Sequence, residues 1–138
     1  PYLSAIASGH GIGKSCFIAW IILWIMSTRR YARGIVTANT QNQLEGKTWA
    51  ELSKWWNMAV NKDWFKYSAT KFYCVLESDG EKNWMFECVP WSEERPEAFA
   101  GLHNAGSAVV NIYDEASAIA DKIWQVSEGA MKMRSSRV

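Results

Sequence analysis

The stretch "ASGHGIGKS", Ala7 to Ser15, places three glycines, a lysine and a serine between a short apolar run and a long one. A loop that binds phosphate needs glycines, so that backbone N–H groups can turn inward without a Cβ clash. It also needs a lysine to reach the outer phosphates and a hydroxyl to bind Mg²⁺. The stretch therefore predicts a phosphate-binding loop that joins a strand to the N-terminus of a helix.

Each residue of this loop has an expected role. Lys14 supplies the cation and Ser15 the Mg²⁺ ligand. The expected nucleotide-binding set is Ser8, Gly9, His10, Gly11, Ile12, Gly13, Lys14 and Ser15. The pattern G-x-x-x-x-G-K-[ST] has glycine at its first position, where this chain has Ser8, so the geometry of the turn departs from the pattern there. The dinucleotide pattern G-x-G-x-x-G fits less well, because it requires glycine where Lys14 stands.

A second, separate signal is the segment "AVVNIYDE", Ala108 to Glu115, in which an apolar strand ends in two carboxylates. In an ATPase site, Asp114 would hold Mg²⁺, directly or through water, and Glu115 would orient and deprotonate the attacking water. The alternative is an exposed acidic turn that caps the next helix. Because this pair follows a strand in a chain that also carries the glycine loop, the two signals together favour a P-loop ATPase.

Hydrophobic periodicity and turn residues predict the other elements. They are, in chain order, a strand at Tyr2–Ala7, a buried helix at Cys16–Met26, a strand after Gly34, a helix at 41–60, two strands at 71–78 and 84–91 joined by a hairpin turn at Asp79-Gly80, and a helix at 118–131. Alternating strands and helices predict an α/β fold of three layers, with a mainly parallel sheet, one antiparallel hairpin and helices on both faces.

Composition narrows the function classes. The charges nearly cancel, with 15 Lys and Arg against 14 Asp and Glu, so no overall basic field indicates nucleic acid. Cys16, Cys74 and Cys88 lack the spacing of a zinc site or a disulfide framework, and we expect buried, reduced thiols. The run Cys16–Met26 is shorter than the roughly 20 residues that a membrane-spanning helix needs. These features favour a reducing cytoplasm and no membrane partner.

Four segments resemble, in the same order, the ATPase domain of the large terminase subunit of tailed bacteriophages, the motor that packages DNA into a prohead. They are "SGHGIGKS", "IVTANTQNQLEGKTWAELSKWW", "RPEAFAGLHNAG" and "VVNIYDEASAIADKIWQVSEGAM". The resemblance extends to about Met131, and the contexts "TANTQNQ" and "DEASAI" narrow it to terminases among P-loop ATPases. It implies that residues 1–138 form one partial P-loop NTPase domain of the ASCE type.

The resemblance also implies the chemistry of the site. ATP and Mg²⁺ would be the cofactors, with Ser15 and Asp114 as the metal ligands. Glu115 would activate water, and Lys14 and Arg95 would stabilise the transferring phosphoryl group. The alternative for Arg95 is a solvated surface residue, which is the usual state of a surface arginine. Thr40 and Gln41 are candidates for contact with the nucleotide or for coupling to DNA. Capping of a helix by Thr40 explains the pair more simply.

In the intact system the resemblance implies double-stranded DNA, a small terminase subunit and a portal protein as partners. It further implies a homo-oligomeric ring in the cytoplasm of a bacterial host.

We expect the family's coupling motif and nuclease domain to be absent, which would remove a central strand between the loop strand and the strand that ends at Asp114. The two strands would then pair directly or leave a gap, and stability should suffer. The alternatives are a non-catalytic, truncated prophage remnant or packaging-protein interaction module, and a helicase or repair ATPase with the same core.

Overall fold

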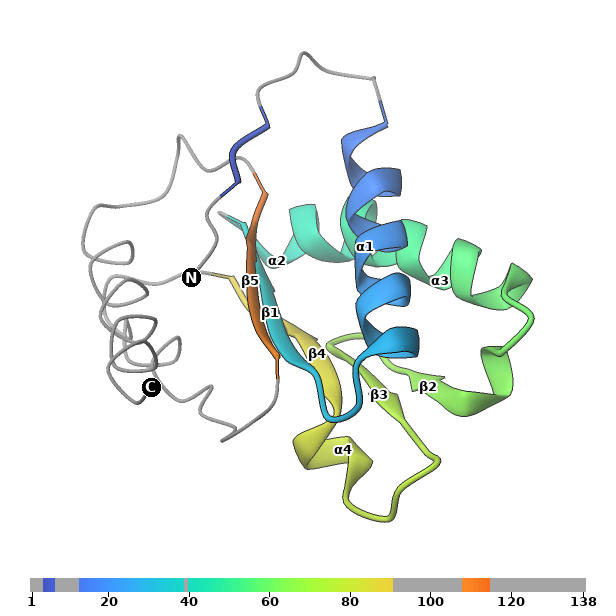
Figure 1. The fold of residues 1–138 in the computed structure, drawn as a ribbon. Helices are drawn as coiled ribbons and strands as arrows, with labels where there is room; N and C mark the ends of the chain where they lie inside the picture. Colours follow the sequence, from blue (N-terminus) through green and yellow to red (C-terminus); the bar gives the residue numbers. More distant parts are fainter. Residues whose placement is uncertain (1–3, 7–12, 39, 91–107, 115–138) are drawn as a thin grey trace, which may run out of the picture.

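A mixed five-stranded sheet forms the centre of the computed structural model, which describes residues 4–6, 13–38, 40–90 and 108–114 (Figure 1). The strand order β2-β3-β4-β1-β5 comprises Phe65–Tyr67, Lys71–Cys74, Met85–Cys88, Arg33–Thr37 and Val109–Tyr113. Strand β1 is parallel to both β4 and β5, whereas β2, β3 and β4 are antiparallel. The α/β class is confirmed. The sheet is mixed rather than mainly parallel, because its antiparallel part contributes as many of the described pairings as its parallel part.

Two long helical segments pack on this sheet. Helix α1, Lys14–Thr28, contains the predicted apolar run. The second segment consists of α2 (Gln41–Gln43), the π-helix η1 (Leu44–Trp49) and α3 (Ala50–Met58). Figure 1 shows α1 and α3 on the same side of the sheet. The helix predicted at 118–131 lies outside the described residues. Among the described helices, none is both long and apolar enough to cross a membrane.

The core lies between the sheet and these two segments. Side chains from α1, the η1–α3 segment and alternate positions of the central strands form one buried cluster, which includes Ile22, Met26, Leu52, Val36 and Phe86. Gly34 of β1 lies directly beside Phe86 of β4 in the parallel register. The Phe86 ring occupies the position that a Cβ of residue 34 would take. Glycine is therefore required at this position by close packing, and it lets a large ring fill the centre of the core.

Helix α1 is only partly buried, which corrects the expectation of a buried helix. Phe17, Trp20 and Trp24 are exposed although the run is apolar throughout. Their spacing places them on one face of the helix, whereas Ile22 and Met26 belong to the buried face. An almost uniformly apolar sequence carries no periodic signal that distinguishes the two faces, so burial on one face could not be predicted.

The predicted strand at Tyr2–Ala7 is wrong for its described part. Ser4, Ala5 and Ile6 form no strand and are exposed, with Ile6 64% exposed. Within the described residues β5 pairs with β1 alone. Ser4–Ile6 therefore do not pair directly with β5. Apolar composition, the glycines that end the segment and the helical run that follows suggested the strand. A β-strand is defined by backbone hydrogen bonds to a neighbouring strand, and an extended segment without these bonds is not a strand.

The predicted hairpin is confirmed as the antiparallel pair β3–β4. Its connection differs from the prediction, because Asp79-Gly80 begins the short helix α4, Gly80–Asn83, instead of forming a tight turn. Asn83 donates hydrogen bonds from its backbone N–H and its side chain to Asp79, which closes this turn. A short strand, β2, adds to the open edge of β3 and was not predicted. The 3₁₀-helix η2, Lys62–Trp64, leads into β2.

The cysteines are free thiols. Cys74 and Cys88 are buried, as predicted, whereas Cys16 is half-buried. Burial raises the pKa of the Cys88 thiol to about 11, and the Cys88 thiol group lies against the carbonyl of Ala69 at 3.4 Å. A thiol with so high a pKa carries almost no thiolate at neutral pH. Cys88 therefore acts as a small core residue.

Candidate functional site

The first turn of α1 holds the described part of the predicted phosphate loop. Gly13 occupies the N-cap position with φ 85 and ψ 22, a left-handed conformation that favours glycine. Its carbonyl accepts the first intrahelical hydrogen bond, from the N–H of Phe17 at 2.9 Å. Among the residues that the structure describes, no side chain caps this helix start. The N–H groups of the first turn have no intrahelical partner, so they can bind an anion next to the half-buried Lys14 and Ser15.

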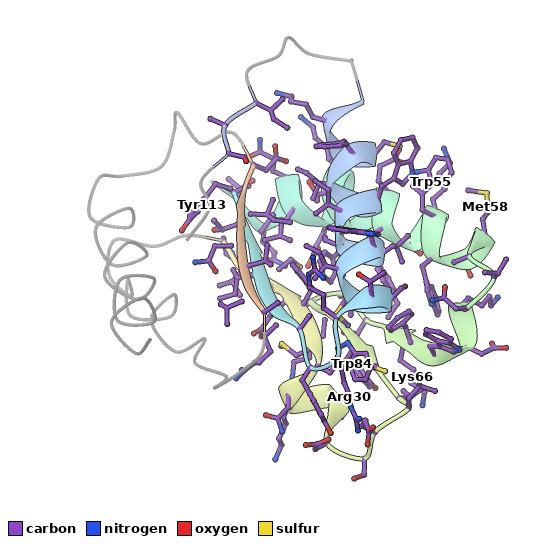
Figure 2. The ribbon with its side chains drawn as sticks, viewed as in Figure 1. Arg30, Trp55, Met58, Lys66, Trp84 and Tyr113 are labelled. Atoms are coloured by element: carbon purple, nitrogen blue, oxygen red, sulfur yellow. The ribbon has the colours of Figure 1, made fainter. Side chains whose placement is uncertain are left out.

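The second part of the site is the carboxyl end of β5. Asp114 follows the last residue of this strand, and its N–H donates to the carbonyl of Thr37 at the end of β1 over 2.9 Å. Figure 2 shows Tyr113 pointing away from α1. Asp114 instead meets the η1 segment, where its Oδ2 accepts a hydrogen bond from the hydroxyl of Thr48 at 3.0 Å. The Asp114 side chain is buried, with 7% of the residue exposed.

These two parts lie at the same end of the sheet. In Figure 1 the first turn of α1 and the carboxyl ends of β1 and β5 are all at the upper end. This follows from the topology, because α1 runs antiparallel to β1, the strand that follows it in the chain, and β5 is parallel to β1. In α/β sheets, ligands bind outside the carboxyl ends of parallel strands. The arrangement is compatible with a phosphate near α1 and a metal near Asp114.

Thr40 and Gln41 contact neighbouring helical residues, and the side-chain amide of Gln41 also lies 4.0 Å from the Cys88 sulfur of β4. The hydroxyl of Thr40 accepts a hydrogen bond from the N–H of Gln43 at 3.2 Å, which is the geometry of an N-cap. The side-chain amide of Gln41 donates to Glu45, one helical turn further on, at 2.7 Å. The structure thus supports the simpler of the two interpretations, in which Thr40 caps the helix.

The other predicted site residues fall outside the described part of the chain. They are Ser8, Gly9, His10, Gly11, Ile12, Arg95 and Glu115. Sequence analysis missed Thr48 as a member of the site. The only signal was a hydroxyl at an otherwise apolar periodic position, between Leu44 and Leu52, where a buried polar group needs a hydrogen-bond partner.

The described residues include oxygen donors of the kind that Mg²⁺ binds. In the described ranges, no three His, Cys, Asp or Glu side chains gather to hold an ion. Magnesium is commonly bound through one or two carboxylates, with phosphate oxygens and waters completing its six ligands. The carboxylate of Asp114 and the hydroxyl of Ser15 are oxygen donors of the kind that such a site requires. Both belong to the same end of the sheet.

The chain is similar to a curated phage protein. No family model matches the chain. The chain is 30% identical, over 140 aligned residues, to a protein of Enterobacteria phage P7 described as "Probable terminase, large subunit". The match covers 98% of this chain and 27% of the phage protein, so the chain spans about a quarter of that relative's length. This similarity along nearly the whole chain confirms the resemblance to the large terminase subunits of tailed bacteriophages.

Proposed function

We propose that this chain is the nucleotide-binding part of a phage DNA-packaging motor, which binds Mg-ATP and hydrolyses it to drive DNA into the prohead. The observation that carries the proposal is the placement of Gly13 and Asp114. The left-handed glycine opens α1 at the same end of the sheet where the buried carboxylate follows a parallel strand. The relative's description as a probable large terminase subunit supports the packaging role.

In this proposal each residue has one task. The loop from Gly9 to Gly13 cradles the phosphates with backbone N–H groups, and Lys14 contacts the outer phosphates. Ser15 and Asp114 hold Mg²⁺, which when bound neutralises charge on the phosphate oxygens. Glu115 orients a water molecule and accepts its proton as the water attacks the γ-phosphate. Arg95 stabilises the charge on the phosphoryl group as it is transferred.

The wider assembly belongs to the same proposal. Double-stranded DNA, a small terminase subunit and a portal protein are the proposed partners of the whole protein, in a homo-oligomeric ring in the bacterial cytoplasm. The match covers 27% of the phage relative, so coupling of hydrolysis to DNA movement is proposed for the whole assembly rather than for this chain by itself.

A second candidate function is a non-catalytic module that contacts other packaging proteins. One observation favours it: the outer face of α1 exposes Phe17, Trp20 and Trp24. Trp20 contacts Trp55 of α3 edge to face, with ring centroids 5.2 Å apart. Met58 of α3 is 59% exposed, and Figure 2 shows it pointing outward from α3. Exposed apolar surface of this kind often marks an interaction site.

Calorimetric titration with Mg-ATP distinguishes the two functions. We expect the wild-type chain to bind Mg-ATP, and Lys14→Ala to weaken binding by about 10- to 100-fold, because an ion-assisted contact to phosphate is lost. Lys66→Ala is the matched control, since Lys66 is exposed on β2 at the sheet edge opposite β5 (Figure 2). Absence of binding in the wild type would favour the interaction module. Equal binding by the wild type and Lys14→Ala would refute the role of the loop.

A further inference from the structure

We infer that Thr48 is a positioning residue for the metal site: its hydroxyl fixes the carboxylate of Asp114 so that the other carboxylate oxygen faces Mg²⁺. The inference rests on the proposed function, because it assigns a task within the same nucleotide site. It adds a residue that lies far from both sequence motifs and that neither motif indicates.

The contact between the two side chains is buried and directional. Thr48 is fully buried, at 0% exposed, and its hydroxyl donates to Oδ2 of Asp114 at 3.0 Å. Within the described residues this is the only side-chain hydrogen bond to the Asp114 carboxylate, and Oδ1 accepts none. A carboxylate held through one oxygen has lost rotational freedom. Its second oxygen is left with a defined direction in which to bind a metal or a metal-bound water.

The element that carries Thr48 is itself firmly held. Thr48 lies in the π-helix η1, between the buried residues Leu44 and Trp49. The indole N–H of Trp49 donates to the carbonyl of Ser68 at 2.7 Å, and the hydroxyl of Tyr67 donates to the carbonyl of Trp49 at 3.1 Å. These bonds tie η1 to the β2–β3 connection. Thr48 also has a β-branched side chain with few χ1 rotamers, so the donor is preorganised.

The π-helical turn gives independent support. Single π-helical turns within α-helices are uncommon and occur frequently at functional sites. Here the turn interrupts an otherwise α-helical segment and contains the one residue of that segment that reaches Asp114 in the described structure. A purely structural role would need a hydrogen bond between η1 and the end of β5, but it would not require that bond to affect the metal.

The test separates metal binding from nucleotide binding. We would measure ATP affinity by calorimetry across a series of Mg²⁺ concentrations, and again in EDTA, for Thr48→Val and Thr48→Ser. Thr48→Val keeps the shape of the side chain and removes the hydroxyl. We expect this variant to need at least about tenfold more Mg²⁺ to reach half of the full increase in ATP affinity, as is typical when the hydrogen-bond partner of a metal ligand is lost. Thr48→Ser keeps the hydroxyl and should behave as the wild type does. ATP affinity in EDTA should be the same for all three proteins.

Thr28→Val is the matched control, because it removes the hydroxyl that donates to the carbonyl of Trp24 in the last turn of α1, at the opposite end of this helix from Lys14. It should leave the Mg²⁺ requirement unchanged. The inference would be overturned if Thr48→Val needed no more Mg²⁺ than the wild type. It would also be overturned if Thr48→Ser needed as much Mg²⁺ as Thr48→Val. If Thr48→Val does not fold, Thr48→Ala removes the same hydroxyl and is subject to the same criteria. Failure of the wild type to bind Mg-ATP would instead refute the proposed function itself.

Discussion

Replacing Trp49 by alanine should lower the free energy of unfolding by about 3–5 kcal/mol, the usual cost of removing a large buried aromatic side chain. Trp49 is 1% exposed and is the largest fully buried side chain in the described core. Its ring stacks on Tyr67 with centroids 6.0 Å apart, and its indole N–H pairs with the carbonyl of Ser68. The substitution would therefore leave a cavity and an unpaired carbonyl between η1 and the β2–β3 connection.

Urea unfolding followed by far-ultraviolet circular dichroism measures this effect. Trp64→Ala is the control, because Trp64 is 40% exposed and its backbone carbonyl still accepts the N–H of Val75 after the change. It should cost far less than Trp49→Ala. Trp49→Phe should fall between the two, since it keeps much of the ring volume and loses the hydrogen bond. Equal losses for Trp49→Ala and Trp64→Ala would contradict the packing described for η1.

Glu115→Gln should reduce ATP turnover by about 10²- to 10⁴-fold, the range that a general base contributes. Glutamine has nearly the same shape but cannot accept the proton of the attacking water, so binding of Mg-ATP should persist. Release of inorganic phosphate measures turnover, and calorimetry measures binding. The contrast between the two readouts assigns the loss to chemistry rather than to affinity.

Glu81→Gln is a suitable control, because Glu81 is exposed on α4, at the end of the sheet away from Asp114 (Figure 1). It should leave both turnover and binding unchanged. Turnover that survives in Glu115→Gln would show that another group activates the water. A wild-type chain that binds Mg-ATP without hydrolysing it would favour the non-catalytic function.

Much of the fold could be predicted because several segments have only one plausible structure. The apolar run after Gly13 is too long for a strand and begins at a glycine, and it forms α1. The strand β2 could not be predicted, because three residues carry too little pattern and Phe65–Tyr67 pairs only where β3 supplies an edge. The π-helix η1 has no sequence signature either, since its hydrogen-bond shift depends on the packing of Leu44 and Trp49.

For the candidate site, sequence motifs indicated the chemistry but not the contacts. Residues such as Lys14 and Asp114 could be proposed from the sequence because phosphate and magnesium require specific functional groups at the ends of specific elements. Thr48 was not identifiable in this way. Its contact with Asp114 spans 66 positions and exists only after η1 and β5 have packed at the same end of the sheet. Hydrogen bonds between residues so distant in sequence follow from tertiary structure rather than from local pattern.

The central claim, that Ser15 and Asp114 share one metal ion beside one nucleotide, is tested most directly by a crystal structure with ATP and Mn²⁺ in place of Mg²⁺, using Glu115→Gln to preserve the nucleotide. The anomalous signal of manganese locates the ion independently of the atomic model. We predict a single ion bonded to the Ser15 hydroxyl and to Asp114, either directly or through one water. An ion bound at the phosphates while the Asp114 carboxylate faces elsewhere would contradict the account.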